Sequence, residues 1–429
     1  MMARWTVARA VSVVAMALWA MASPAWAQEQ TQPGTEQPQL QREPPLPLPT
    51  TLTSYPLELL GLLAPPSGAT VLIPSIGFFE EYNDNLFLVN TNKTSDFKTE
   101  ISPAVALFVN RPRYRIIAGY SFSSELHSHD SNLNEFFGRQ NFLLGSYFNV
   151  TRDLSLRLSD SFAWDRNSGT GGSQPFTVGR QLSWVNTFSP GALWQITPRT
   201  SLDLSAGYEA RRFLGSGIGL DSDTYRFDSG LGYGFTSRFT GTIGYSFTYI
   251  DTHGDVDSTT HNPHLGFRYA LTPSLTFSIS GGPAITQIAG ETDISPAGNV
   301  GLMWYLRYGY LSAEYTRGVS VAGGFGGTTD TQTVALTLAL TRLVRNMVFF
   351  VTPSYNNSQS VSNRQADQVD IQAYAVSLGV TYQISRYFNV FAGYDFLHQR
   401  TGGGSTLQVD ADQNRVKVGL QFGYPISFN

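Results

Sequence analysis

The chain has few charged residues and no cysteine. Of its 429 residues, 14% are Asp, Glu, Lys or Arg, against about 25% in an average soluble protein, so little charge is available to cover a water-exposed surface. The formal net charge of -4 is too small to indicate a nucleic-acid partner. The lack of cysteine suits a chain that crosses an oxidising compartment, although many cytosolic proteins share it.

Long apolar runs are missing after residue 27. No later stretch reaches the roughly 20 apolar residues that a membrane-spanning helix needs, which excludes a helical membrane protein. Aromatic residues (13%) and glycine (41 residues) are abundant instead. A chain poor in charge whose mean hydropathy is only -0.13 is best explained by strands with one apolar and one polar face.

The N-terminus has the pattern of a secretory signal. Arg4 and Arg9 supply the positive region, Ala10 to Leu18 the apolar core, and Ala25-Trp26-Ala27 a cleavage site between small residues. The alternative is a membrane anchor, but the apolar run is too short to span a bilayer. We therefore expect a signal peptide over residues 1–27 and a mature chain that begins near Gln28.

Residues 28–70 differ in composition from the rest of the chain. Gln, Pro, Thr and Glu dominate up to residue 52, with four prolines between Pro44 and Pro49, so this part cannot bury a core. Five leucines between Thr53 and Ala64 fit one short helix that ends before Pro65. We expect an extended or disordered periplasmic tether, in which the leucines pack at the base of the following domain rather than plug it.

Residues 71–429 show a period of two. In Thr242 to Ile250, apolar Ile243, Tyr245, Phe247 and Tyr249 alternate with Thr, Gly and Ser. Runs of this kind extend for 9 to 13 residues around residues 373–384 and 415–428, which matches a tilted crossing of a membrane rather than a short soluble strand.

Connections between these runs alternate in length, as in transmembrane barrels whose short turns face the periplasm. Short turns are expected at residues 150–153, 197–200, 237–238, 272–274, 307–308, 342–345 and 385–386. Longer loops are expected at residues 84–96, 127–135, 166–179, 215–223, 252–258, 289–293, 322–330, 359–370 and 400–412. A soluble propeller or sandwich would carry charge where these strands carry Tyr, Phe and Leu. We predict an all-β transmembrane antiparallel up-and-down β-barrel of about 18 strands, with 16 as the alternative.

The first predicted hairpin has a recognisable motif. Phe79-Glu80-Glu81-Tyr82-Asn83-Asp84-Asn85-Leu86-Phe87, followed by Asp96-Phe97 and Ile101-Ser102-Pro103, resembles the opening of the β-barrel porin family of proteobacterial outer membranes. Members are often associated with exopolysaccharide gene clusters. The resemblance implies an outer-membrane location. The last strand also looks like a signal for the barrel-insertion machinery, although Asn429 follows Phe428 where a terminal Phe is usual.

Charged residues inside the strands share the phase of Gly, Ser and Thr. A charge facing lipid at mid-membrane costs about 2 to 4 kcal/mol, so these side chains should line the lumen, either as a hydrated pore or as ion pairs that brace the wall. The set comprises Arg115, Arg157, Asp203, Glu209, Arg211, Arg226, Asp228, Arg268, Glu314, Asp395, Arg415 and Lys417. Asp160 is in the opposite phase, and we expect a bulge or the membrane interface to accommodate it.

Catalytic and metal-binding patterns are weak. His127-x-His129 with Asp130, or Asp251 with Asp255 and Asp257, could bind a metal, but neither spacing is specific, and solvated loop residues are the favoured interpretation of both groups. No GxSxG, HExxH or phosphate-binding glycine loop occurs in its required context. We expect no enzyme, no cofactor and no resident metal.

The sequence therefore predicts a porin-like channel of the cell outer membrane for small or polysaccharide-type polar solutes. The alternative is a non-conducting structural or exopolysaccharide-associated barrel that acts as a scaffold or adhesin. Expected partners are outer-membrane lipid, the barrel-insertion machinery and polysaccharide export components, with no nucleic acid. Because the charges expected in the lumen have mixed signs, neither cation nor anion selectivity follows from the sequence. The solute and the oligomeric state do not follow from it either.

Overall fold

A computed structural model describes residues 70–166, 180–215, 219–321, 324–325, 327–341, 343–362, 368–402 and 410–428. Contacts divide the chain into Met1–Pro45 and Leu46–Asn429, and every described residue lies in the second unit. The predicted signal peptide, tether and leucine-rich segment over residues 1–69 lie outside the described residues.

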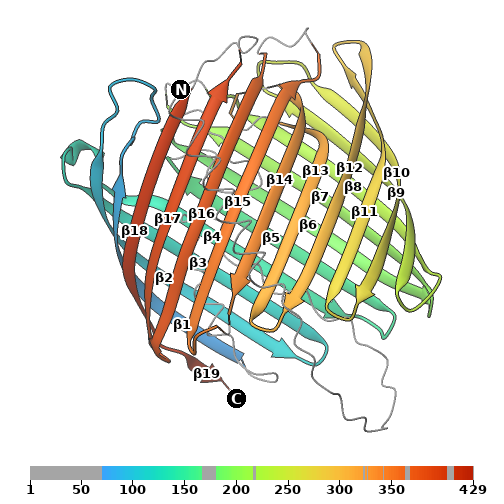
Figure 1. The fold of residues 1–429 in the computed structure, drawn as a ribbon, viewed down its shortest axis with the longest axis horizontal. Coiled ribbons are helices and arrows are strands. Elements are labelled where there is room, and N and C mark those ends of the chain that lie inside the picture. The colour runs from blue at the N-terminus through green and yellow to red at the C-terminus, as the bar shows by residue number, and fades with distance from the viewer. Residues whose placement is uncertain are drawn as a thin grey trace, which may run out of the picture. The chain divides into compact units, whose positions relative to one another are not determined.

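The described chain forms one antiparallel sheet in which consecutive strands are neighbours (Figure 1). The strands are β1 (Thr70–Asn83), β2 (Asp96–Arg111), β3 (Tyr114–His127), β4 (Glu135–Asn149), β5 (Leu154–Asp165), β6 (Ser183–Thr197), β7 (Thr200–Phe213), β8 (Ser222–Gly234), β9 (Phe239–Thr252), β10 (Ser258–Thr272), β11 (Leu275–Ile288), β12 (Glu291–Leu306), β13 (Gly309–Val321), β14 (Thr328–Leu340), β15 (Met347–Ser360), β16 (Asp370–Ser385), β17 (Phe388–Thr401), β18 (Ala411–Gly423) and β19 (Ile426–Phe428).

The sheet closes on itself because β1 pairs with both β2 and β18. The register along this seam runs from Ser75 opposite Gly423 to Asn83 opposite Arg415. β19 continues the path of β18 and pairs with the first residues of β1, so the barrel has 18 strands around its circumference. The predicted fold class and strand number are confirmed.

Between β18 and β19 the paired register of the seam is interrupted. Pairing with β1 stops at Gly423 and resumes at Ile426, and Pro425 in the gap has no N–H to donate. Opposite the gap lies Pro74 of β1, whose carbonyl accepts a bond from the Tyr424 N–H at 3.0 Å.

Strand length and alternation agree with the sequence pattern. The strands from β1 to β18 run from 12 residues in β5 to 16 in β2, enough to cross the hydrocarbon layer at a tilt. In β18, Val416, Val418, Leu420 and Phe422 are exposed, whereas Arg415, Lys417 and Gln421 between them are buried. Two different faces are the reason for the period of two.

The two ends of the barrel differ, and we name them the turn end and the loop end. β1 begins and β19 ends at the turn end (Figure 1), where pairs such as β6 and β7 are joined by two residues. A further short turn that the sequence analysis did not identify, Pro112-Arg113, joins β2 and β3 there.

One predicted loop is wrong. Residues 289–293 were expected to form a longer loop, but Ile288 pairs with Glu291, and only Ala289 and Gly290 connect β11 to β12 at the loop end. Both residues have positive φ, 51° and 78°, as in the tight hairpin turns that match the twist of a sheet. The polarity of residues 289–293 suggested a loop, but Glu291 to Asp293 are the first residues of β12.

Helix is almost absent from the described residues. One 3-10 turn, Ser131–Leu133, lies between β3 and β4, with Asp130 accepting the Asn132 N–H as its N-cap. Within the described part of the chain, no helix is long and apolar enough to cross a membrane.

Candidate functional site: the inward face of the barrel

The outward face presents apolar side chains to its surroundings. Ile243 of β9 and Leu265 of β10 lie opposite each other and are 64% and 65% exposed. Tyr233, Trp194 and Trp304 are exposed near the turn end of their strands. Apolar side chains at this density are stable in contact with hydrocarbon rather than water.

The inward face is identified by side chains that meet across an intervening strand. Lys417 of β18 contacts Glu100 of β2 over β1, and Arg139 of β4 contacts Glu100 over β3. Such pairs bridge two strand spacings, roughly 10 Å, which is easiest where side chains converge. The face that carries these three residues is therefore the concave one.

Alternation along each strand places the predicted charged residues on this inward face, in two environments. One set is exposed or partly exposed on strands β5 to β13, and we name it the exposed wall: Arg157, Asp203, Arg226, Asp228, Arg268 and Glu314. A second set, Asp395, Arg415 and Lys417, is buried. Arg115, Glu209 and Arg211 are intermediate in exposure.

Ion pairing on the exposed wall is sparse. Arg157 of β5 reaches over β6 to bond with Asp203 of β7, and the two side chains remain 47% and 43% exposed. Gly191 of β6 makes this contact possible, because a Cβ there would lie 2.5 Å from Arg157 Nε. Glu209 and Arg211 approach to 3.5 Å on β7. This wall therefore offers hydrated charge of both signs.

A dense group of ion pairs lies instead beside the seam, and we name it the seam network. It comprises three acids and three bases, formally balanced and each no more than 9% exposed: Glu81, Glu100, Glu125, Lys98, Arg139 and Lys417. Glu100, with no exposed side-chain area, is its centre: its carboxylate lies 2.7 Å from Lys417 Nζ and 3.3 Å from Arg139 Nη1. Lys98 Nζ lies 3.1 Å from Glu125 and 3.7 Å from Glu81.

Further polar contacts extend from the network on both sides. Arg139 Nε also bonds to Asp165 of β5 at 3.1 Å, and Arg415 Nη2 bonds to Asp395 of β17 at 3.1 Å. The result is a line of charge pairs from β17 across the seam to β5. Because the Lys417–Glu100 pair joins β18 to β2, the complete seam network forms only when the first and last strands have met.

Sequence reasoning identified Lys417 but missed Glu81, Lys98, Glu100, Glu125 and Arg139. A signal was present: Lys98 and Glu100 are in phase with Ser102, which is buried on the inward face of β2. The pairing itself depends on which residues of β18 lie opposite β1, and a strand-by-strand pattern does not contain that register.

Amide side chains from the recognised motif secure the loop end of the seam. Asn85, which is fully buried, donates from Nδ2 to the carbonyls of Val89 and Asp412, each at 2.8 Å. Gln413 Nε2 donates to Asn83 Oδ1 and to Asn85 O. The motif in the first hairpin therefore holds the first strand to the last, which is a role in barrel closure.

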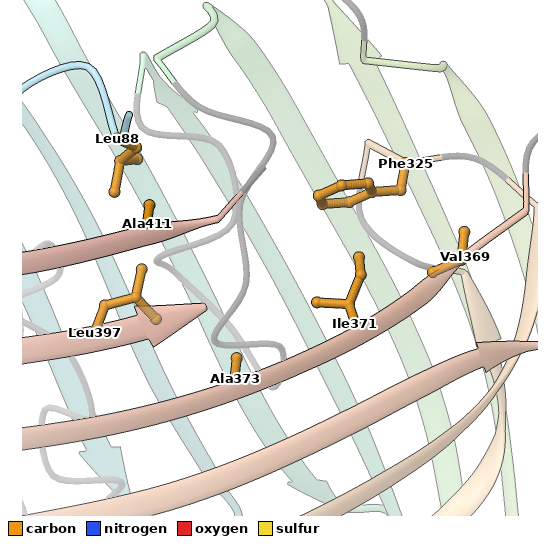
Figure 2. Packing of buried hydrophobic residues seen from close by; sticks show 7 residues of the cluster. All are labelled: Leu88, Phe325, Val369, Ile371, Ala373, Leu397 and Ala411. Carbon is orange, nitrogen blue, oxygen red and sulfur yellow. The ribbon is translucent and has the colours of Figure 1, made fainter. Parts of the chain in front are cut away.

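The loop end is partly filled by an apolar cluster (Figure 2), which we name the loop-end cluster. Its buried members are Leu88, Phe325, Val369, Ile371, Ala373, Leu397 and Ala411, with Phe213 and Ala375 packed against it. Leu88 comes from the connection between β1 and β2, and Phe325 from that between β13 and β14. Both lie over inward-facing side chains of β16, β17 and β18.

Polar contacts also cross the barrel at this end. Thr328 Oγ1 at the start of β14 donates to Ser258 Oγ at the start of β10 at 2.6 Å, and both residues are at most 2% exposed. The Leu220 N–H, after β7, donates to the Gly324 carbonyl at 3.1 Å. Strands that are far apart around the barrel are thus joined at the loop end.

Asp160 is on the outward face, as its phase predicted. The expected bulge is absent, because β5 pairs without a break with both β4 and β6 around this residue. Asn186 on β6 supplies a partner instead, donating from Nδ2 to Asp160 Oδ1 at 2.9 Å. Within the described part of the chain, a carboxylate therefore lies on the outward face near the middle of β5 and is hydrogen-bonded to an amide.

The predicted histidine group is assembled differently from expectation. His127 and His129 both direct Nδ1 to Asp96, at 2.6 and 2.9 Å, whereas Asp130 caps the 3-10 turn. Among the described residues, the side chains with metal-like spacing are Asp223, Asp251 and His253, and Asp223 is already bonded to Arg212 at 2.6 Å and to Tyr208.

One acidic residue outside the strands is strongly held. Asp410, in the connection that precedes β18, accepts bonds from the N–H and the Oγ1 of Thr401, each at 2.7 Å. These hydrogen bonds favour the carboxylate and lower the pKa of Asp410 below its usual value.

No family model and no curated protein matches this chain. Among solved structures, it is similar to Pseudomonas aeruginosa OpdQ, with 10% identity and a TM-score of 0.44 over 84% of this chain and 100% of that one. For Pseudomonas aeruginosa OccK5 (OpdH), the identity is 11% and the TM-score is 0.42 over 84% of this chain and 99% of that one. For the anion-selective porin from Comamonas acidovorans, the identity is 10% and the TM-score is 0.33 over 83% of this chain and 99% of that one. At these values the likeness carries no inference about a solute.

Proposed function

We propose that this protein is an outer-membrane, porin-like channel for small or polysaccharide-type polar solutes. The observation that carries the proposal is the contrast between the two faces of the same strands. Outward residues such as Ile243 and Leu265 are exposed and apolar, whereas Arg226, Asp228 and Arg268 on the inward face are exposed and charged. Apolar surface suits hydrocarbon, and exposed charge requires water.

The exposed wall is the part of the inward face that a solute would contact. Arg226 and Asp228 lie two residues apart on β8, and Arg268 and Glu314 lie on β10 and β13. Mixed charges beside small Ser, Thr and Gly side chains favour a polar solute over a strongly anionic or cationic one. Arg115, Glu209 and Arg211 extend the proposed lining, whereas Asp395, Arg415 and Lys417 are too buried to contact a solute directly.

Conductance in planar lipid bilayers tests the proposal. Stepwise current from purified full-length protein is the expected result. Replacing Arg226 and Arg268 by Ser should shift the reversal potential in a salt gradient toward cation preference, because two cations leave the path. Arg212→Ser is the matched control, since Arg212 is an outward-phase arginine of β7 paired with Asp223. An equal shift in the control, or no shift in the double variant, would defeat the assignment.

A non-conducting scaffold or adhesin is the second candidate function. The loop-end cluster favours it, because packed side chains at that end reduce the open area of the barrel. Under this proposal the inserted protein remains silent in bilayers while the barrel stays fully folded. Its partners would be polysaccharide or polysaccharide export components at the loop end, and removal of the gene product would alter surface attachment rather than solute uptake.

A further inference from the structure

The loop-end cluster includes residues from opposite walls of the barrel. Ile371 and Ala373 belong to β16, whereas Phe213 is the last residue of β7. With 18 strands in the ring, β7 and β16 are nine positions apart, which is half the circumference. Eighteen strands tilted by about 40° make a circular barrel roughly 35 Å across. Direct packing of opposite walls is therefore impossible in a circular barrel without side chains that bridge the lumen.

Leu88 and Phe325 are the bridging side chains. Both come from connections rather than strands, and they are 3% and 1% exposed. In Figure 2, Ile371 is directed toward Phe325, and Leu88 lies near Ala411. The Gly324 carbonyl accepts the N–H of Leu220, which follows β7, so the backbone beside Phe325 is bonded to the wall that carries Phe213.

Resting on the proposed channel function, we propose that Leu88 and Phe325 form an apolar seal that sets the aperture of the channel at its loop end. Solutes that enter the barrel at the turn end meet hydrated charge on the exposed wall and then an apolar constriction. Water is depleted in a narrow passage lined by Phe, Leu, Ile and Val side chains, so ions cross it slowly. The seal would limit the ion current through a barrel that is wide enough for large solutes.

Phe325 lies between two glycines that have positive φ. Gly324 and Gly327 have φ of 87° and 72°, a region that residues with a Cβ rarely adopt. Phe325 is thus placed by a backbone path that depends on glycine rather than by a regular strand. Outward displacement of its ring would break apolar contacts and leave the strand ladder intact.

Two measurements on the full chain test the seal. The first is single-channel conductance of the wild type, of Phe325→Ala and of Leu88→Ala/Phe325→Ala. The second needs no current: Leu397→Cys in the cluster introduces the chain's only thiol, and its labelling rate by a membrane-impermeant maleimide is compared with and without Phe325→Ala. Phe350→Ala, a buried inward aromatic outside the loop-end cluster, is the matched control.

We expect Phe325→Ala to raise conductance several-fold and the double variant to raise it further, while labelling of Cys-substituted Leu397 becomes at least ten times faster. The control should change neither. Wild-type conductance equal to that of the variants would overturn the seal and leave the channel proposal standing. If no variant conducts but labelling is fast in the Phe325→Ala background, the result would support the seal and overturn the channel proposal. Equal labelling in both backgrounds would overturn the seal regardless of current.

Discussion

The exposed wall and the seam network use the same residue types on the same face of the same sheet, but with opposite consequences. Arg157 and Asp203 keep nearly half of their side-chain area in contact with solvent, whereas Lys417 and Glu100 have none. Charges that remain hydrated gain little from pairing. Charges that have lost water depend on their partners. The exposed wall thus keeps the hydrated charge that the proposed function requires, whereas the seam network is committed to structure.

The largest expected effect comes from removing one charge of the seam network. Glu100→Gln keeps the shape of the side chain but leaves Lys417 and Arg139 without their shared carboxylate. We expect a loss of about 3 to 5 kcal/mol of stability, measured in vesicles as a lower urea midpoint for the heat-modifiable folded band. Glu314→Gln on the exposed wall is the control and should change the midpoint little. Equal effects of the two variants would remove the distinction between the two regions.

Asp160 provides a third environment, on the outward face and hydrogen-bonded to the Asn186 amide. Asp160→Leu should stabilise the barrel by about 1 to 2 kcal/mol, because an outward carboxylate near mid-strand costs free energy in lipid. The same urea titration measures it, with Asp228→Leu on the exposed wall as control. A destabilised Asp160→Leu barrel would mean that protein rather than lipid covers this part of β5.

A smaller effect is expected for the ion pair of the exposed wall. A double-mutant cycle on Arg157→Ala and Asp203→Ala should give a coupling energy of about 0.2 to 1 kcal/mol, decreasing with salt. The corresponding cycle on Lys417 and Glu100 should give a coupling several times larger and insensitive to salt. Strong salt dependence of the seam pair would show that water reaches it.

The smallest effect concerns Asp410, outside the strands. Because hydrogen bonds from Thr401 lower its folded-state pKa, this carboxylate stabilises the fold above its unfolded pKa of about 4, and the contribution is lost as the pH falls through the folded-state value. Acid should therefore destabilise wild type slightly more than Asp410→Asn. A urea series from pH 7 to pH 2 measures the difference, and parallel curves would contradict the assignment.

The local sequence pattern was sufficient to predict the two faces of each strand. It was not sufficient to predict the contacts between strands that are not neighbours. The alternation of Val416 and Lys417 gave the two faces of β18 directly, because side-chain direction has a period of two. Glu100 could have been assigned to the inward face in the same way. Its bonds to Lys417 and Arg139 could not, since they depend on closure and on the curvature that brings alternate strands together.

The loop-end cluster was beyond sequence reasoning for a different reason. Leu88 and Phe325 lie in connections, where no periodic pattern assigns a side chain to a face. Their neighbours Ile371 and Leu397 were recognisable as strand residues, but nothing local indicates that loop residues would cover them. Asp160 was assigned correctly to the outward phase, whereas its partner Asn186 became evident only from the paired strands.

The interruption opposite Pro74 determines at which end the first and last strands of the barrel separate first. Paired register is continuous from Ser75 to the loop end of the seam, and there the amides of Asn85 and Gln413 reinforce it. At the opposite margin the strands are joined by three residue pairs with β19 and by the bond from the Tyr424 N–H to the Pro74 carbonyl. Mechanical force on the C-terminus should thus separate β19 from β1 first, and separation should stop at Gly423. The last few residues can therefore detach while the rest of the barrel stays closed.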